Sequence, residues 1–330
     1  MVNYYYNMGV MISEKNKPVI GLALGGGGAR GFAHLGILKV LAQYGLNIEI
    51  VAGTSIGAIV GAAYAAGYPI DEMIAIAKSN DWKKLLKMVD LSLPAKGLIK
   101  GRKIEDYLRG LLRDKNFANL SKRLVVVATD IETGREEWID KGDIIRAIHA
   151  SIAIPGIFEP VKINDSIYVD GSITAPVPWK AAFAAGADIV IAVDVSSPMT
   201  GTEYLYKLSY IFQSDWYKRI SQKTGVDYYV NNILPASIRI VSKSLKLNKM
   251  VSRSDHINSR NMFTVRPDLG DIRWYDFHRI EDCITAGEVK QKNIEEKLFS
   301  AFKTSFTNTL GWEGKELSQH ALNRWQNTDL

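Results

Sequence analysis

The chain has 330 residues, of which 47% are hydrophobic and 23% are charged, a balance typical of a globular protein with a large core. Lysine and arginine exceed aspartate and glutamate by 41 to 35, a net charge of +6 that favours anionic surfaces only mildly. The single cysteine, Cys283, excludes an internal disulfide framework and a multi-cysteine metal site. No apolar stretch reaches the roughly 18 residues of a transmembrane helix.

Short apolar runs alternate with helical patterns along the first 200 residues. The predicted strands are Val19–Leu24, Ile48–Ala52, Leu124–Thr129, Ser166–Val169 and Ile189–Val195. The predicted helices are Arg30–Tyr44, which Gly45 ends, a small-residue helix after Ser55, and Val177–Ala185. This alternation predicts a parallel or mixed sheet with helices on both faces.

The remaining segments are less regular. Residues 80–123 are rich in lysine and leucine and predict helices with loops, and residues 199–262 predict one or two long polar helices. Residues 1–17 are expected to form a flexible N-terminal arm, with one domain from 18 to 300 and a C-terminal extension from 301 to 330.

Four consecutive glycines, Gly25–Gly28, follow the first strand and precede a helix. Gly26, Gly28 and Gly31 satisfy the spacing of a dinucleotide-binding loop. Such a loop requires an acidic residue at the end of the second strand, but Glu49 stands near the start of that strand. A dinucleotide site is therefore disfavoured, which leaves a tight structural turn, a phosphate-binding loop or an oxyanion site.

The second strand ends in the sequence GTSIG, which has the pattern G-x-S-x-G between a strand and a helix. In this position Ser55 is expected to project from a sharp turn as a nucleophile, with Gly53 and Gly57 leaving room for the crowded backbone. A serine that attacks an ester creates an oxyanion, which backbone amides stabilise. The neighbouring glycine run can supply such amides, and Arg30 adds positive charge there.

A serine nucleophile needs a base. The chain has five histidines (His34, His149, His256, His278 and His320), but none stands in a recognisable catalytic pattern. Asp170 is a better candidate because it follows a short strand and precedes Gly171, at a sheet edge where active sites of α/β folds collect. The alternative interpretation of Asp170-Gly171 is a turn with no chemical role.

Together the motifs GGGGARG, GTSIG and DGS resemble the bacterial branch of the patatin-like phospholipase family, over about residues 18–292. The segments ATDIETG, ASIAIPGIFEPV and RPDLGDI are similar to further blocks of that family. The resemblance implies a three-layer α/β/α sandwich with a central, mostly parallel sheet, and a Ser-Asp dyad instead of a triad. It assigns Ser55 as nucleophile, Asp170 as base, and Gly25, Gly26, Gly27, Gly28 and Arg30 as the oxyanion hole.

The resemblance also implies the reaction. The chain is expected to be a carboxylic ester hydrolase of the phospholipase A or lysophospholipase type, working through an acyl-enzyme without metal or cofactor. Ser172 stands where the family pattern has glycine or alanine. The alternatives are a carboxylesterase of the α/β-hydrolase type with a histidine base, or a catalytically silent regulator on the same scaffold.

Residues 237–266 carry seven basic residues against one acidic residue, Asp255. With their apolar positions they suit an interfacial helix that contacts anionic lipid, and a solvated helix face is the alternative interpretation. No nucleic-acid recognition motif accompanies the charge. We expect a phospholipid or lysophospholipid partner, and a cytoplasmic or peripheral membrane location because no secretory signal pattern is present.

Overall fold

The computed structural model describes residues 18–79, 100–113, 115–155, 157–196 and 261–288. The predicted N-terminal arm and C-terminal extension, the segment from 80 to 99 and the predicted polar helices between 199 and 260 lie outside these ranges. The domain boundaries at 18 and 300 therefore stay predictions.

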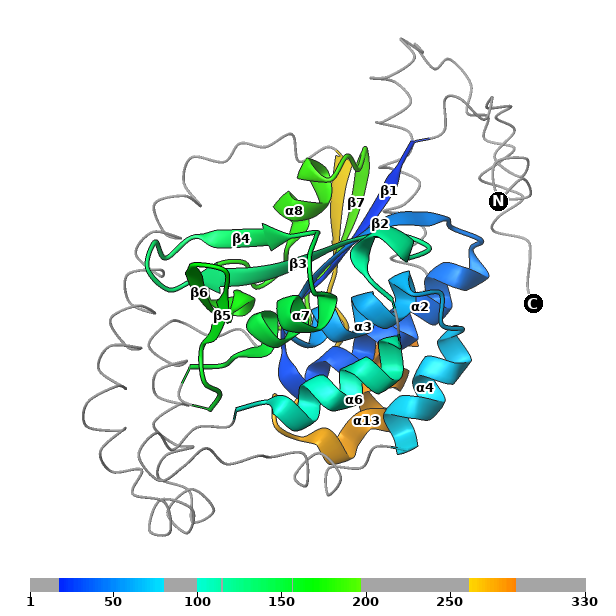
Figure 1. The fold of residues 1–330 in the computed structure, drawn as a ribbon. Coiled ribbons are helices and arrows are strands. Elements are labelled where there is room, and N and C mark those ends of the chain that lie inside the picture. Colours follow the sequence, from blue (N-terminus) through cyan, green and yellow to red (C-terminus); the bar gives the residue numbers. More distant parts are fainter. Residues whose placement is uncertain (1–17, 80–99, 114, 156, 197–260, 289–330) are drawn as a thin grey trace, which may run out of the picture.

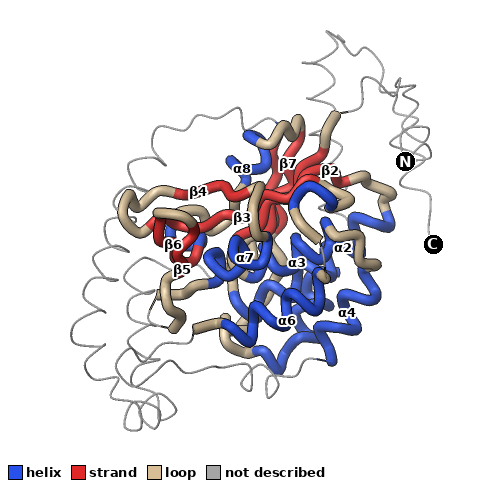
Figure 2. The backbone as a smooth tube through the Cα atoms, viewed as in Figure 1, coloured by secondary structure: helices blue, strands red, loops and turns tan. Residues whose placement is uncertain are grey.

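A mixed sheet forms the centre of the described part of the chain (Figures 1 and 2). Its strand order is β5-β6-β3-β2-β1-β7-β8, and β4 pairs with β3 outside this path. The parallel strands are β1 (Ile20–Leu24), β2 (Ile48–Thr54), β3 (Arg123–Asp130), β7 (Ile189–Val193) and β8 (Met262–Val265). Strands β4 (Glu136–Ile139) and β6 (Ser166–Asp170) each pair antiparallel with β3, and β5 (Val161–Ile163) pairs antiparallel with β6.

Helices cover both faces of this sheet, which confirms the predicted sandwich. On one face α3 (Ile56–Ala65) and α7 (Ile144–Ile152) contact the strands. The same larger core extends to the helices that pack on them and on one another, α2 (Ala33–Gln43), α4 (Ile70–Ser79), α6 (Arg102–Leu112) and α13 (Ile280–Glu288). The other face packs against α8 (Trp179–Ala184) through a smaller, alanine-rich core. Figure 1 shows α8 on the opposite side of the sheet from α2, α3 and α6.

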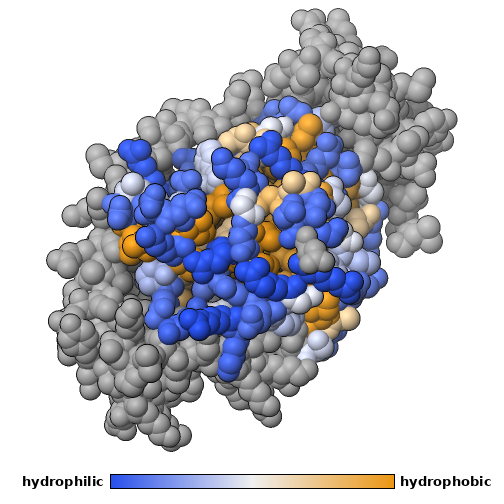
Figure 3. Space-filling model, viewed as in Figure 1, coloured by the Kyte–Doolittle hydropathy of each residue, from blue (hydrophilic) through white to orange (hydrophobic). Residues whose placement is uncertain are grey.

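Alternation along the strands divides the core between the two faces. In β1, Leu22 and Leu24 belong to the larger core, whereas Ala23 belongs to the smaller one beside α8. Successive side chains of a strand point to opposite faces, so one apolar run serves both layers. On the face that Figure 3 shows, hydrophilic residues dominate the described surface and hydrophobic residues show between them.

Most predicted elements are confirmed, with differences at their ends. The helix expected from Arg30 begins as a 3-10 turn, η2 (Gly28–Phe32), and becomes α-helical at Ala33. The predicted helix that reached Met262 is wrong at its end, because Met262–Val265 forms strand β8 and pairs with β7. For the same reason the last residues of the basic segment 237–266 do not belong to an interfacial helix. Residues 237–260 of that segment lie outside the described residues.

Candidate active site

Ser55 stands alone between the end of β2 and the start of α3. Its backbone has φ 54° and ψ −125°, a conformation that non-glycine residues rarely adopt and that costs on the order of 1–3 kcal/mol. Close packing of the backbone around this turn explains why glycines flank Ser55. A Cβ on Gly53 would lie 2.6 Å from the Cα of Ala58, and a Cβ on Gly57 would overlap the carbonyl oxygen of Leu24. The sequence GTSIG therefore forms the strained strand–turn–helix elbow that the motif predicts.

The side chain of Asp170 meets Ser55 across the sheet. Strand β6 pairs antiparallel with β3, which lies parallel beside β2, and this order brings the ends of β2 and β6 together. The Ser55 hydroxyl donates a hydrogen bond of 2.8 Å to Oδ2 of Asp170. Both residues are buried, with 7% of Ser55 and 3% of Asp170 exposed. A strained serine and a buried carboxylate thus form one hydrogen-bonded pair.

Burial controls the protonation of this carboxyl group. It raises the pKa of Asp170 from its ordinary value to about 6, because the charged form loses its hydration. Hydrogen bonds from the Ser172 amide, the Ser55 hydroxyl and the Ser172 hydroxyl act in the opposite direction. The amide of Ser172 donates to Oδ1 at 2.7 Å, so both carboxylate oxygens have a donor. At neutral pH Asp170 is mostly ionised, yet it is a stronger base than a solvated aspartate.

The remaining residues around the pair fix its backbone. The amide of Ser55 donates to Oγ of Ser151 at 2.8 Å, and this hydroxyl donates in turn to the carbonyl oxygen of Val127 at 2.6 Å. The Thr129 hydroxyl donates to the carbonyl oxygen of Asp170 at 2.9 Å. Sequence reasoning placed Ser151 and Thr129 in segments similar to family blocks, ASIAIPGIFEPV and ATDIETG, but gave neither residue a role. Gly171 fits because a Cβ there would overlap the Val127 carbonyl oxygen.

The glycine run lies directly against Ser55. A Cβ on Gly26 would lie 3.3 Å from the Ser55 Cβ and would overlap the Ser172 hydroxyl, so a larger residue there would displace the Ser172 side chain. The amides of Gly25 and Gly26 are already paired, with Val193 O at 3.0 Å and with Pro176 O at 2.9 Å. Within the described residues no acceptor is recorded for the amides of Gly27 and Gly28. Of the four predicted amide donors, these two are the ones left to bind a ligand.

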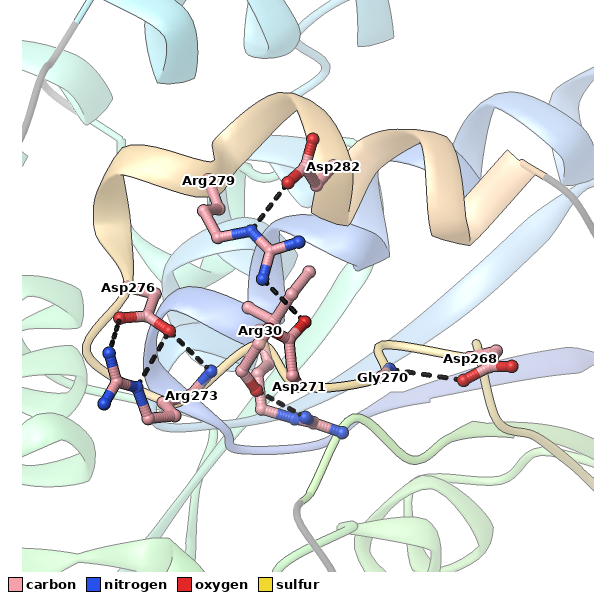
Figure 4. Close-up of polar contacts among 9 residues, drawn as sticks. Arg30, Asp268, Gly270, Asp271, Arg273, Asp276, Arg279 and Asp282 are labelled. Carbon is pink, nitrogen blue, oxygen red and sulfur yellow. Dashed lines mark hydrogen bonds and ion pairs between the residues drawn. The ribbon is translucent and has the colours of Figure 1, made fainter.

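Arg30, which the sequence placed in the oxyanion hole, is used differently. Arg30 is 8% exposed, and its guanidinium donates to the carbonyl oxygens of Val195 at 2.8 Å and Ile272 at 2.6 Å. Figure 4 shows the side chain beside the segment that contains Ile272. The guanidinium therefore bonds backbone carbonyl oxygens instead of facing a ligand. The predicted positive charge does lie next to the glycine run.

Two of the three described histidines bind other partners, and the third is exposed. Nε2 of His34 donates to the carbonyl oxygen of Gly25 at 2.8 Å, and burial lowers the pKa of His34 to about 4, so the ring is neutral. Nδ1 of His149 lies 2.6 Å from a Glu105 carboxylate oxygen. His278 is exposed. His256 and His320 lie outside the described residues. The side chain that accepts the hydrogen bond of the Ser55 hydroxyl is thus a carboxylate, and His34 bonds the glycine run.

The described ranges contain no cluster of three or more His, Cys, Asp or Glu side chains that could hold a metal ion. Burial raises the pKa of the Cys283 thiol to about 11, which keeps it protonated and unreactive. None of the helices described is both long and apolar enough to span a membrane.

The fold and the elbow define an α/β protein with a serine–carboxylate pair at the carboxyl end of its central strands. Comparison with known families adds the particular class. Residues 22–183 match the family of patatin-like phospholipases, so the chain carries a domain of this kind there. The match covers the glycine run, the elbow and Asp170, and confirms the resemblance that the motifs indicate.

Individual relatives share the same part of the chain. An uncharacterised NTE family protein of Mycobacterium tuberculosis (strain ATCC 25618 / H37Rv) is 37% identical over 190 residues, 58% of this chain and 52% of that protein. Lysophospholipase NTE1 of Yarrowia lipolytica is 35% identical over 184 residues, 54% of this chain and 13% of that protein. The chain thus spans about half the length of the mycobacterial relative and a much smaller share of the fungal one.

Among solved structures, VipD from Legionella pneumophila has a TM-score of 0.38 and 15% identity, covering 93% of this chain and 79% of that chain.

Proposed function

We propose that the chain is a serine acyl hydrolase that releases fatty acid from phospholipids or lysophospholipids. The observation that carries the proposal is the 2.8 Å hydrogen bond from the strained Ser55 to the buried carboxylate of Asp170. The match to the patatin-like phospholipase family supports a lipid ester as substrate, and the relative named lysophospholipase NTE1 supports the lysophospholipid in particular.

The first half of the reaction uses Ser55 as nucleophile. Its oxygen attacks the ester carbonyl carbon as its proton moves to Asp170, and the carbonyl oxygen becomes an oxyanion. The amides of Gly27 and Gly28, which bond no acceptor in the described part of the chain, donate to this oxyanion next to the start of α3. When the tetrahedral intermediate collapses, the leaving alcohol takes the proton from Asp170 and the acyl group stays on Ser55.

The second half repeats these steps with water. Asp170 accepts a proton from a water molecule that attacks the acyl carbonyl, and returns it to the Ser55 oxygen as the fatty acid leaves. Every proton transfer needs Asp170 to alternate between its two forms. A pKa of about 6 suits this alternation better than that of a solvated aspartate.

A direct test measures fatty acid released from phosphatidylcholine vesicles and from lysophosphatidylcholine, with mass spectrometry of protein treated with a fluorophosphonate. We expect release by the wild type, a loss of at least about 10³-fold in Ser55→Ala, and an adduct on Ser55. Ser121→Ala is the matched control, because its hydroxyl bonds the Ala65 carbonyl oxygen outside the site. Folded wild type without adduct or release would contradict the proposal and favour the silent regulator.

A further inference from the structure

The glycine run is held from one side by a segment more than 240 residues further along the chain, residues 269–279. The amide of Ala29 donates to the carbonyl oxygen of Trp274 at 2.7 Å. Gly28, at φ +57°, lies so close to the same carbonyl that a Cβ would overlap it. Arg30 donates to Ile272 O at 2.6 Å. The last glycine of the run and the two residues that follow it thus rest on the backbone of this segment, which we call the buttress.

Ionic contacts brace the buttress itself (Figure 4). The amide of Arg273 donates to Asp276 Oδ2 at 2.9 Å, and the Arg273 guanidinium reaches the same carboxylate at 3.2 Å. Asp276 is 5% exposed, so these contacts fix the turn that presents the Trp274 carbonyl. The Arg279 guanidinium forms ion pairs with the carboxylates of Asp271, at 2.8 Å, and Asp282, at 2.6 Å. These two contacts connect the buttress to the start of α13.

Arg30 also connects the buttress to the end of β7. Besides Ile272 O, its guanidinium donates to Val195 O at 2.8 Å, two residues beyond the strand. A guanidinium can satisfy two separate carbonyls because its donors form a rigid planar fork, whereas a lysine ammonium is a single point of charge on a flexible stem. The arrangement uses the shape of Arg30 as well as its charge.

We propose that Arg30 and the buttress are positioning elements that aim the amides of Gly27 and Gly28 at the oxyanion, without touching the substrate themselves. The inference rests on the proposed function and deepens it. It also extends the functional unit beyond residues 22–183, the part that matches the family. A displacement of about 1 Å in a catalytic group can cost on the order of 10²-fold in rate, so a small movement of the run is enough to matter.

The test uses the full chain with Arg30→Lys, which keeps the charge but not the fork, and Asp276→Asn, which weakens the turn. We measure kcat, KM and the affinity of a trifluoromethyl ketone that adds to Ser55 and forms a hemiketal oxyanion. Both variants should lose about 10- to 10²-fold in kcat with KM nearly unchanged, and ketone affinity should fall by a similar factor.

Glu281→Gln is the matched control, one position before Asp282 on α13. Glu281 pairs with Lys78 at 3.0 Å on the exposed side of the helix, so the variant breaks an ion pair that does not reach the glycine run. We expect its kcat and ketone affinity to stay within about twofold of wild type, since such surface pairs contribute little.

Hydrogen exchange of the peptide that covers residues 25–32 gives a readout independent of hydrolysis. Arg30→Lys and Asp276→Asn should speed exchange in this peptide, because the Ala29 amide loses its fixed acceptor, whereas Glu281→Gln should not. Unchanged exchange, or unchanged kcat and ketone affinity beside an inactive Ser55→Ala, would overturn the inference and leave the proposed function standing. A wild type without hydrolysis would overturn the proposed function, and the exchange result would still decide whether the buttress holds the run.

Discussion

The hydroxyl of Ser55 and the carboxylate of Asp170 lie 2.8 Å apart although 115 positions separate them in the sequence. Their strands are joined only through β3, which pairs with β2 on one side and with β6 on the other. The sheet order is therefore what creates the pair, and the consequences can be tested one residue at a time.

Activity should depend on pH through Asp170. Its carboxylate must be ionised to accept the Ser55 proton, and its pKa is about 6. We expect kcat/KM to be level above about pH 7 and to fall about tenfold per unit well below pH 6. Initial rates of fatty acid release between pH 4.5 and 8, on a substrate without a titrating group in that range, measure this. An acid limb near pH 4 would mean that Asp170 is not the group that titrates.

Ser172→Ala should move that acid limb to higher pH. The Ser172 hydroxyl stabilises the charged form of Asp170, so its removal raises the pKa, while the backbone amide at 2.7 Å from Oδ1 remains. The comparison of pH profiles for the variant and the wild type measures the shift. A limb that stays in place or moves to lower pH would show that this hydroxyl does not bear on the carboxylate.

Asp170→Asn should make the protein more stable at neutral pH. The pKa of Asp170 is higher in the folded protein than in the unfolded chain, so the folded state binds more protons between about pH 4 and 6. The contribution of the Asp170 carboxyl group to the free energy of unfolding is thus complete below about pH 4 and is lost as the pH rises through 6. At pH 7 the variant avoids burying a charge, and its free energy of unfolding should rise by on the order of 1–3 kcal/mol.

Urea unfolding at pH 7 and at pH 4.5 measures this effect. The difference between variant and wild type should shrink at the lower pH, where the wild-type carboxyl group is protonated in the folded state. A variant that is less stable than the wild type at pH 7 would contradict the assignment of the raised pKa.

Ser151→Ala should harm both stability and rate. It leaves the buried amide of Ser55 without its acceptor, at a cost of about 1–3 kcal/mol, and removes one donor from the carbonyl of Val127. Because that amide belongs to the strained elbow, kcat should fall in the folded variant while KM changes little. Urea unfolding and steady-state kinetics beside Ser121→Ala measure the two effects, and a variant equal to the control in both would exclude a role for Ser151.

The sequence predicted those elements that depend on residues close to one another along the chain. The strand–elbow–helix around Ser55, the turn after Asp170 and the glycine that ends α2 depend on nearby residues: Gly45 has φ 62° and bonds back to Ala42. Short strands with mixed side chains were missed. Strand β4, with the sequence EEWI, and the three-residue β5 are defined by pairing with β3 and β6, and pairing leaves no strong local pattern.

The supports of the site could not be predicted for a related reason. Ser151 reaches Ser55 across 96 positions and Arg30 reaches Ile272 across 242. A serine or an arginine has the same local appearance whether it braces an active site or faces water. The family resemblance assigned Arg30 to the oxyanion hole, but the fold turns its guanidinium onto backbone carbonyls.

The kinetics of Asp170→Asn test the central claim most directly, measured beside Ser55→Ala, the double variant and the histidine variants His256→Gln and His278→Gln. Since the two side chains act as one unit, we predict that each single change removes at least about 10³-fold of the fatty acid release and that the double variant loses little more. The histidine variants should match wild type. Release by Asp170→Asn within about tenfold of wild type, or its loss in either histidine variant, would contradict the account.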